Sequence, residues 1–421
     1  MSNISRSQPQ FKLLPALLMM VGWLLCHGAA LAQGTIKVAF VAPFSGPTAA
    51  QGDAYLKMLK FAMDRTNARG NVLGKKFELV TFDDKGQPSE ALIALKSVTD
   101  QNIPIVIQGI GSNIGAAMLE GVSKHNARNP NNRVLYLNSS SQADDMTEEK
   151  CDFWHFRFVA NVGMRVAAMV KNLPKDVKTV YLMNQDYVYG QGIQAQTKKF
   201  LAQYRPDIKI VGDEMIPLQR VKDFSSHVAK VKASGAQVLV TSTWGADFVL
   251  MMKAGNEAGL NVQYYSFGAF VNGSPTAMGD GGLNRVVAVL DSNDNIGAEN
   301  KNASSEEFVK AWRATDTGLD YSWIQFQVLW DMLGVAINKA GSTDPLKVAL
   351  ALEGLQVPNI HGEPTIMRAD DHQLLQPLYA AVFTKPVKYD SEKTGLGWKT
   401  LSKASTQELT LPTVCKMKRP S

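Results

Sequence analysis

Two short polar segments carry residue types that suit the binding of a small anion. The first, residues 108–115, reads Gln-Gly-Ile-Gly-Ser-Asn-Ile-Gly, and it lies between a predicted strand and a predicted helix. Glycines let a ligand approach the backbone closely, and free amides at a helix N-terminus attract anions. The segment therefore predicts a site for a carboxylate or similar small group at Ser112, with plain turn chemistry as the alternative.

A nucleotide is a second interpretation of the same glycines, because dinucleotide-binding proteins carry a similar pattern. That pattern requires an acidic residue at the end of the next strand, where it holds the ribose. Here the next predicted strand, residues 134–137, is followed by Asn138, Ser139, Ser140, Ser141 and Gln142. The missing acid argues against a nucleotide, and we expect no cofactor.

This run of serines is itself the second candidate segment. It follows a predicted parallel strand at its carboxyl end, which is where ligands bind in open α/β sheets. Ser140, Ser141 and Gln142 offer hydroxyls and amides that could converge on one oxygen-rich group. Together with Ser112 they would form a cradle for a carboxylate; a solvated loop is the alternative.

Aromatic residues follow three predicted strands in the second half of the chain. Aromatic walls with few polar groups are typical of clefts that bind small molecules. The strands are expected at residues 177–184, 238–242 and 263–266, and the aromatic residues after them are Tyr187, Tyr189, Trp244, Phe267 and Phe270. Each one alone could be core or surface, but their shared position favours ligand contact.

Residues for catalysis or metal binding do not form a recognisable set. The sequence contains no nucleophile elbow, no phosphate-binding loop with its lysine, and only six histidines, which lack the spacing of a shared metal site. Arg157 could pair with a ligand anion or serve a structural role between lobes. We therefore expect a binding protein, not an enzyme, with no metal.

Short apolar runs alternate with longer helical patterns along residues 36–290, which predicts an α/β protein with parallel sheets. Two such series meet near Asn161, and this length exceeds what one hydrophobic core usually serves, so we expect two lobes. Near the C-terminus, residues 363–368 and 378–383 predict a β-hairpin. The polar residues from Lys385 onward are expected to lie along the surface.

The N-terminus has the features of a cleaved secretory signal. Arg6 and Lys12 precede an apolar run at residues 13–25, and Ala30-Leu31-Ala32 supplies small residues for cleavage after Ala32. A membrane anchor is less favoured because the run is shorter than the roughly 20 residues that a span requires. Cys26 leaves lipidation as a further alternative, although the preceding Leu25 is large.

The charge balance limits the kinds of partner that the chain could bind, and the number of cysteines limits the disulfides that it could form. The chain has 44 basic and 38 acidic residues, of which two basic and no acidic ones lie in the first 32, so nucleic acid is not an expected partner. Removal of the signal would also remove Cys26, leaving Cys151 and Cys415. In an oxidising compartment two thiols favour a disulfide that fixes the C-terminal tail, with two free cysteines as the alternative.

The order of several motifs resembles the leucine/isoleucine/valine-binding protein family of periplasmic binding proteins. Residues 43–47 read Pro-Phe-Ser-Gly-Pro and residues 51–53 read Gln-Gly-Asp, followed by a helix and a strand ending at Asp83-Asp84. Later, residues 189–192 read Tyr-Gly-Gln-Gly and residues 223–225 read Asp-Phe-Ser. Each motif is weak alone, but the resemblance covers essentially the whole chain after the signal.

This resemblance implies a type I periplasmic binding protein fold, in which two Rossmann-like lobes are joined by a hinge of several strands. After the signal at residues 1–32, it places residues 33–160 and 291–374 in lobe 1, and residues 161–290 and 375–421 in lobe 2.

The resemblance also implies roles for single residues. Ser112 and the loop Ser140-Ser141-Gln142 would bind the ligand carboxylate, and Tyr189 and Trp244 would close over the ligand from lobe 2.

Departures from the family bear on the ligand. Where amino-acid binders of the family have an acid for the ligand ammonium, this chain has Phe267-Gly268-Ala269 and, at a second position, Asn161. Gln51 stands where the family has a tyrosine. An unpaired buried ammonium costs several kcal/mol, so an ordinary α-amino acid is disfavoured unless one of three other acids substitutes: Asp186, Asp247 or Asp291.

The sequence thus predicts the periplasmic receptor of an ATP-driven importer. It would act as a monomer, binding a small carboxylate and docking on a permease. An aromatic or branched aliphatic acid is favoured over a branched-chain amino acid, and an amide or urea-like ligand is a further alternative. A sensor that delivers the same ligand to a membrane receptor would share every feature above.

Overall fold

A computed structural model describes residues 1–3 and 34–420 of the chain. The expected signal segment and its cleavage after Ala32 lie outside the described residues, apart from residues 1–3, and stay predictions. No helix in the described part combines the length and apolar character needed to cross a bilayer. The described strands form two large sheets and one small sheet.

The first large sheet has five parallel strands in the order β2-β1-β3-β4-β5. They are β1 (Thr35–Ala42), β2 (Lys76–Asp83), β3 (Ile105–Gln108), β4 (Leu135–Asn138) and β5 (His155–Arg157). β3 and β4 are buried along their whole length, as expected for apolar runs in a parallel sheet covered on both faces.

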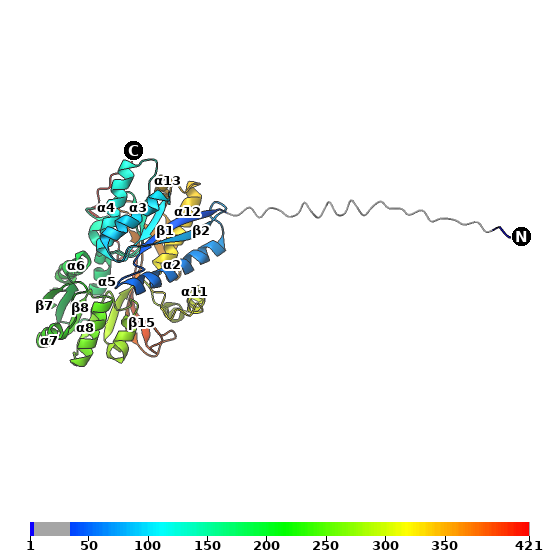
Figure 1. Cartoon of the computed structure of the whole chain (residues 1–421). Helices are drawn as coiled ribbons and strands as arrows, with labels where there is room; N and C mark the ends of the chain where they lie inside the picture. Colours follow the sequence, from blue (N-terminus) through cyan, green and yellow to red (C-terminus); the bar gives the residue numbers. More distant parts are fainter. Residues whose placement is uncertain (4–33, 421) are drawn as a thin grey trace.

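Helices from two distant parts of the chain cover this sheet (Figure 1). α2 packs against α12, and α3 packs against α4. Trp330 of α12 illustrates the packing, because it is fully buried and its indole N–H donates to the Leu59 carbonyl of α2 at 2.9 Å. The helices and the short 3₁₀ segment of this half are α2 (Ala49–Arg69), α3 (Pro88–Asp100), α4 (Ser112–Arg128), η1 (Asp144–Thr147), α10 (Ile296–Glu299), α11 (Ala303–Arg313), α12 (Gln325–Ala340) and α13 (Pro345–Leu352).

The second large sheet has seven strands in the order β15-β14-β10-β9-β8-β6-β7. They are β6 (Thr179–Gln185), β7 (Lys209–Ile216), β8 (Val238–Thr241), β9 (Gln263–Ser266), β10 (Val286–Leu290), β14 (Leu378–Thr384) and β15 (Gly397–Ala404). Only β14 and β15 run antiparallel to their neighbours in this sheet. The accompanying helices are α5 (Val162–Lys171), α6 (Val188–Tyr204), α7 (Ser225–Ala233), α8 (Ala246–Glu257), α9 (Ser274–Met278) and η2 (Gly279–Gly282).

The C-terminal region differs from its sequence-based prediction. β12 (Pro364–Met367) pairs with β11 (Gln356–Pro358) and β13 (Leu374–Leu375) in the small sheet, whereas β14 pairs with β10 and β15. The predicted hairpin of residues 363–368 and 378–383 is therefore wrong. β15 was missed because it is an edge strand whose polar residues, such as Lys399, hide the strand pattern.

The chain crosses between the two large sheets after β5, after β10 and between β13 and β14. A fully buried ion pair joins these crossings: the Arg165 guanidinium of α5 contacts the carboxylate of Asp291, which directly follows β10. The amide of Gln376, from the third crossing, donates to the other Asp291 oxygen at 2.6 Å. One carboxylate thus connects all three segments.

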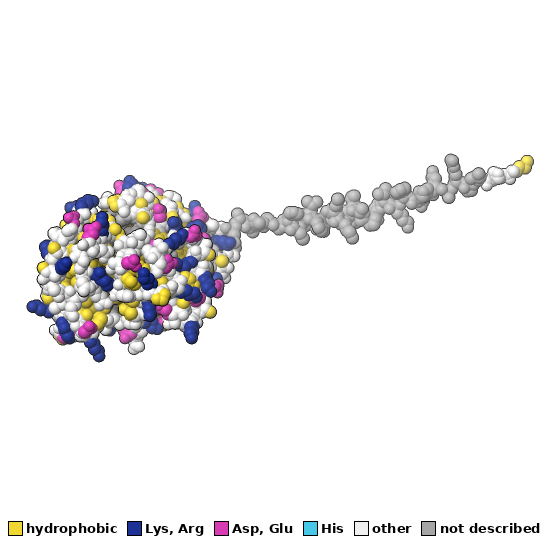
Figure 2. Space-filling view, turned by 90° about the horizontal axis from the view of Figure 1, so that it is seen from below, with side chains coloured by type: hydrophobic (Ala, Val, Ile, Leu, Met, Phe, Trp, Pro, Cys, Tyr) yellow, Lys and Arg dark blue, Asp and Glu magenta, His cyan; other side chains and the backbone are white. Residues whose placement is uncertain are grey.

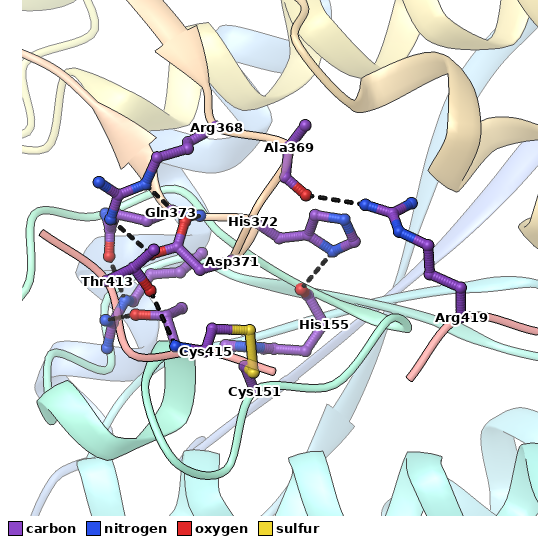
Figure 3. The surroundings of a disulfide bond; sticks show 12 residues. Cys151, His155, Arg368, Ala369, Asp371, His372, Gln373, Thr413, Cys415 and Arg419 are labelled. Carbon is purple, nitrogen blue, oxygen red and sulfur yellow. Dashed lines mark hydrogen bonds and ion pairs between the residues drawn. A yellow bond between two sulfur atoms is a disulfide. The ribbon is translucent and has the colours of Figure 1, made fainter. Parts of the chain in front are cut away.

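The C-terminal tail crosses once more, from the second half back to the first. Leu409 is buried in the hydrophobic core of the second half, while Cys415 forms a disulfide with Cys151 that spans 5.8 Å between Cα atoms. Figure 3 shows this disulfide beside Arg368, whose guanidinium donates to the Leu411 carbonyl at 2.7 Å. The chain end lies beside α4 and α13 in Figure 1.

Candidate functional site

A cavity lies where the strand ends of the two large sheets face each other, and it holds about 450 Å³ of empty space. Trp323 and the wall residues within 51–142 come from the part of the molecule built on the first sheet, and those within 187–271 come from the part built on the second sheet. The lining residues are Gln51, Tyr55, Gly109, Ile110, Gly111, Ser112, Ser140, Gln142, Tyr187, Tyr189, Trp244, Phe267, Val271 and Trp323. Seven of the eight predicted ligand-binding residues are among them, and Ser141 is the exception.

Ser112 occupies the first position of α4, as the anion-site hypothesis requires. Its Oγ accepts hydrogen bonds from the backbone amides of Gln142 and Ala143, at 3.1 and 3.3 Å. Because both lone pairs are used, the hydroxyl proton remains available to donate to a ligand. The two amides also fix Ser112 to the serine loop, so both predicted segments form one structure.

The serine loop approaches the glycine segment very closely. A β-carbon at Gly109 would lie 2.3 Å from the backbone nitrogen of Ser140, so only glycine permits this contact. Ser140 Oγ and Gln142 Oε1 are buried and have no hydrogen-bond partner among the described residues. Buried polar groups are normally paired, so these orphaned atoms identify the end of the cavity where a polar ligand group binds best.

Ser141 points away from the cavity. Its hydroxyl donates to the carbonyl of Gly109 at 2.7 Å and contacts that of Gly111 at 3.2 Å. In this structure Ser141 therefore positions the glycine segment instead of lining the cavity.

Aromatic side chains form the rest of the wall. From the second half, the Trp244 indole N–H donates to the Tyr187 hydroxyl at 2.8 Å, which fixes both rings. Tyr189 and Phe267 complete this side. Burial raises the pKa of the Tyr187 and Tyr189 phenols, so both stay protonated and able to donate.

Two aromatic residues that line the cavity from the side of the first sheet were not predicted. Tyr55 and Trp323 line the cavity with ring centroids 5.1 Å apart. Tyr55 lies one helical turn after Gln51 in α2, so the four-residue spacing from a predicted site residue was a usable signal. Trp323 precedes α12 in an irregular segment, and no local pattern marked it.

The three acids considered as partners of a ligand ammonium are all occupied elsewhere. Asp247 accepts hydrogen bonds from Gln185 Nε2 at 2.6 Å and from the Gln219 amide at 2.9 Å. Asp291 pairs with Arg165, and Asp186 is exposed, where it binds Gln191. No described residue that lines the cavity carries a formal charge.

Arg157 has a structural role. The side chain is fully buried, and its Nε donates to Gln373 Oε1 at 2.6 Å while its Nη atoms donate to Ala143 and Thr147. It does not line the cavity, and it connects the end of the serine loop to Gln373, which directly precedes β13.

Among the described residues, no group of three or more His, Cys, Asp or Glu side chains is placed to hold a metal ion. The cavity also has no lysine or arginine that would bind a nucleotide phosphate. Its chemistry is confined to hydroxyls, amides and aromatic rings.

Two α/β lobes that enclose an uncharged aromatic cavity define a two-lobed solute-binding protein. The profile of the periplasmic binding protein family matches residues 35–386, and the chain belongs to this family. The type I fold expected from the sequence is confirmed.

Known relatives agree with this assignment. A Leu/Ile/Val-binding protein homolog 4 of Brucella abortus (strain 2308) is 27% identical over 414 residues, covering 94% of this chain and 96% of its own. The closed-conformation crystal structure of a leucine-, isoleucine-, valine-, threonine-, and alanine-binding protein from Brucella ovis is 26% identical, with a TM-score of 0.82, covering 92% of this chain and 100% of its own. These relatives are binding proteins, and this chain is likewise not an enzyme.

A benzoate complex of a solute-binding protein from R. palustris has a TM-score of 0.74 and 20% identity, covering 91% of this chain and 100% of its own. At that identity the likeness supports the fold alone.

Proposed function

We propose that this protein is the periplasmic receptor of an ATP-driven importer, and that it captures a small carboxylate and presents it to the permease. The favoured ligand is an aromatic or branched aliphatic acid. The chain would be exported by the signal at residues 1–32, cleaved after Ala32, and would act as a monomer. The sequence-based lobe boundaries, residues 33–160 plus 291–374 and 161–290 plus 375–421, belong to this proposal.

The observation that carries the proposal is the contrast between the two ends of the cavity. At one end, the Ser112 and Ser140 hydroxyls each have a proton to donate, whereas the unpaired Gln142 atom is the acceptor Oε1, so Gln142 could donate only through Nε2. Charge-assisted hydrogen bonds from such donors would hold a carboxylate. The remaining wall is aromatic and uncharged, which suits a flat or branched apolar body and offers no partner for an α-ammonium.

Binding would act through the hinge. Because Ser112 and Trp244 reach the same cavity from different lobes, a ligand that touches both would stabilise the closed arrangement. The permease would then recognise the closed form.

Branched-chain amino acids are the second candidate, because the Brucella relatives are named for them. Their ammonium would need water or backbone carbonyls as partners in this cavity, since no lining residue is acidic.

A ligand screen separates these candidates. The chain without residues 1–32 would be tested by thermal shift and calorimetry with benzoate, 4-hydroxybenzoate and isovalerate against leucine and valine. We expect the acids to raise the melting temperature and the amino acids to have little effect. Strong stabilisation by leucine or valine, with none by the acids, would overturn the proposed ligand class.

The variant Ser112→Ala tests the carboxylate end. Loss of one hydrogen bond to a charged group costs about 1.5–3 kcal/mol, so affinity for a bound acid should fall roughly tenfold to a hundredfold. Ser139→Ala is the matched control, because Ser139 is a buried serine of the same loop that does not line the cavity. Equal affinities of the wild type and Ser112→Ala would refute the assignment.

A further inference from the structure

A second cavity adjoins the first one. Gln51, Tyr55 and Trp323 line both cavities, so the two meet at these side chains. The space not filled by atoms in and around the second cavity, open solvent at its mouth included, is about 370 Å³. Its apolar wall consists of Ala54, Met58, Phe270, Pro275 and Leu319, and its polar wall includes Asp320, Ser322 and Glu392.

Two polar side chains at the second cavity are buried without a protein partner. Gln51 is 7% exposed and Ser322 is 4% exposed, and no hydrogen bond joins either side chain to another described residue. Neither side chain is among the fully enclosed polar atoms without a partner, so the amide and the hydroxyl remain accessible and have bonding capacity left for a molecule in the cavity. Because Gln51 lines both cavities, its amide could form a hydrogen bond with a molecule in either one.

The polar wall of the second cavity carries an excess of negative charge. Asp294 and Asp320 share one guanidinium, because Arg313 Nε lies 2.7 Å from Asp294 and its Nη2 lies 2.6 Å from Asp320. The Glu392 carboxylate is held only by neutral donors: the Gly273 amide at 2.6 Å, and the amide and hydroxyl of Thr276 at 2.9 and 2.6 Å. Asp390 also lies 3.9 Å from this guanidinium, so three acids share Arg313, while Glu392 has no cationic partner among the described residues; of these acids, Asp320 and Glu392 line the cavity.

Burial raises the pKa of Asp320 well above its ordinary value, and the neighbouring Asp294 carboxylate adds to this effect. Arg313 only partly opposes it. Each Asp320 oxygen accepts one hydrogen bond, from Arg313 or from Ser391, so each retains a lone pair for another donor. These effects favour the neutral form of Asp320 in the empty cavity, and a cation bound beside it would favour the carboxylate instead.

We propose that the second cavity is a subsite for the far end of the ligand and that it takes a hydrogen-bond donor, above all an ammonium group, beside Asp320, Ser322 and Glu392. The preferred ligands would then be ω-amino carboxylates, which carry the acid at Ser112 and the ammonium beyond Trp323. This inference rests on the proposed carboxylate site. It also accounts for the absence of an acid where an α-ammonium would lie.

The test uses ligands that differ only at the far end. Calorimetry on the chain without residues 1–32 would compare 4-aminobutanoate, 6-aminohexanoate and 8-aminooctanoate with the alkanoates that lack the amine, and 4-(aminomethyl)benzoate with 4-methylbenzoate. For the ligand length that spans both cavities, we expect the ω-amino carboxylate to bind at least about tenfold more tightly than the matched acid without the amine. An amine that never improves affinity at any length would overturn the subsite.

Two variants test whether the preference for the amino ligand arises in the second cavity. Asp320→Asn should remove most of the advantage of the amino ligand while leaving the matched alkanoate within about twofold. The control is Asp316→Asn, because Asp316 is an exposed acid in the same segment that pairs with Lys393 and lines neither cavity. An equal effect of both substitutions would mean that the preference is a general charge effect, and would refute the subsite.

Filling the cavity gives an independent test if Asp320→Asn does not fold. Ala54 lines only the second cavity, so Ala54→Leu should abolish binding of the longest amino acid and spare benzoate. Unchanged binding of the long ligand would exclude the subsite. If neither the amino acids nor the plain acids bind to the wild type, the proposed carboxylate-binding function fails. If the acids bind but the amine gives no gain in affinity, only the subsite fails.

Discussion

His361 shows how a single buried side chain can give the protein an acid-sensitive stability. Its Nε2 lies 2.8 Å from Ser292 Oγ and its Nδ1 lies 2.7 Å from Ser305 Oγ, so it joins the segment after β10 to α11. Burial lowers the pKa of His361 to about 4. The unfolded chain, with an ordinary histidine pKa of roughly 6.5, therefore binds more protons than the folded one between these values.

The contribution of His361 is fully present above about pH 6.5 and is lost as the pH falls toward about 4, amounting to roughly 3 kcal/mol. Urea unfolding of the wild type and of His361→Gln across this range would measure it. The stability difference between the two proteins should shrink or reverse at low pH. A difference that stays constant from pH 7.5 to 4 would contradict this prediction.

About half of the residues that line the cavity were predicted from the sequence, because those residues follow predicted strands. Ser112 and Gln142 follow strands directly, so their position at the carboxyl ends of a sheet could be predicted from strand order. Trp323 comes from an irregular segment far along the chain. Its place in the cavity depends on how α12 packs against α2, which is a tertiary contact without a sequence pattern.

At the scale of elements, we expect substitutions in the buried ion pair of Arg165 and Asp291 to destabilise the fold strongly. The pair joins α5 to the segment after β10, and both side chains are fully buried. Removing one partner leaves an uncompensated buried charge, so Asp291→Ala should reduce the free energy of unfolding by about 3–5 kcal/mol.

The double variant Arg165→Met, Asp291→Leu distinguishes loss of charge balance from loss of packing. We expect it to recover most of the stability in urea unfolding, because apolar replacements of similar volume are often neutral. A double variant as unstable as Asp291→Ala would show that the pair is needed for its hydrogen bonds to Val289 and Gln376.

Most elements were predicted because their patterns are long or fully apolar. β9 has the predicted boundaries, residues 263–266. The failures lie where pairing partners are distant in sequence: β14 lies between β10 and β15 instead of pairing with β12. Periodicity indicates that a segment is a strand but not which strand it joins.

At the scale of the whole molecule, the charged side chains on one face are mixed in sign. On the face seen in Figure 2, basic and acidic side chains are interspersed. This distribution agrees with a small-molecule ligand and gives no support for a nucleic acid partner.

The disulfide ties the two ends of a very long loop, since Cys151 and Cys415 are 264 residues apart. Closing such a loop restricts the unfolded chain, and native disulfides typically contribute about 2–5 kcal/mol. The double variant Cys151→Ser, Cys415→Ser should melt at a lower temperature than the oxidised wild type. Reductant should lower the melting temperature of the wild type and leave the double variant unchanged; equal melting temperatures throughout would contradict the prediction.

The same disulfide also has a consequence for the order of events during export. In a chain exported N-terminus first, Cys151 would reach the oxidising compartment well before Cys415, which lies 264 residues further on. Residues 33–421 contain two cysteines, so an intramolecular disulfide within them can join only this pair. The covalent ring would therefore close only after Cys415 itself has been exported.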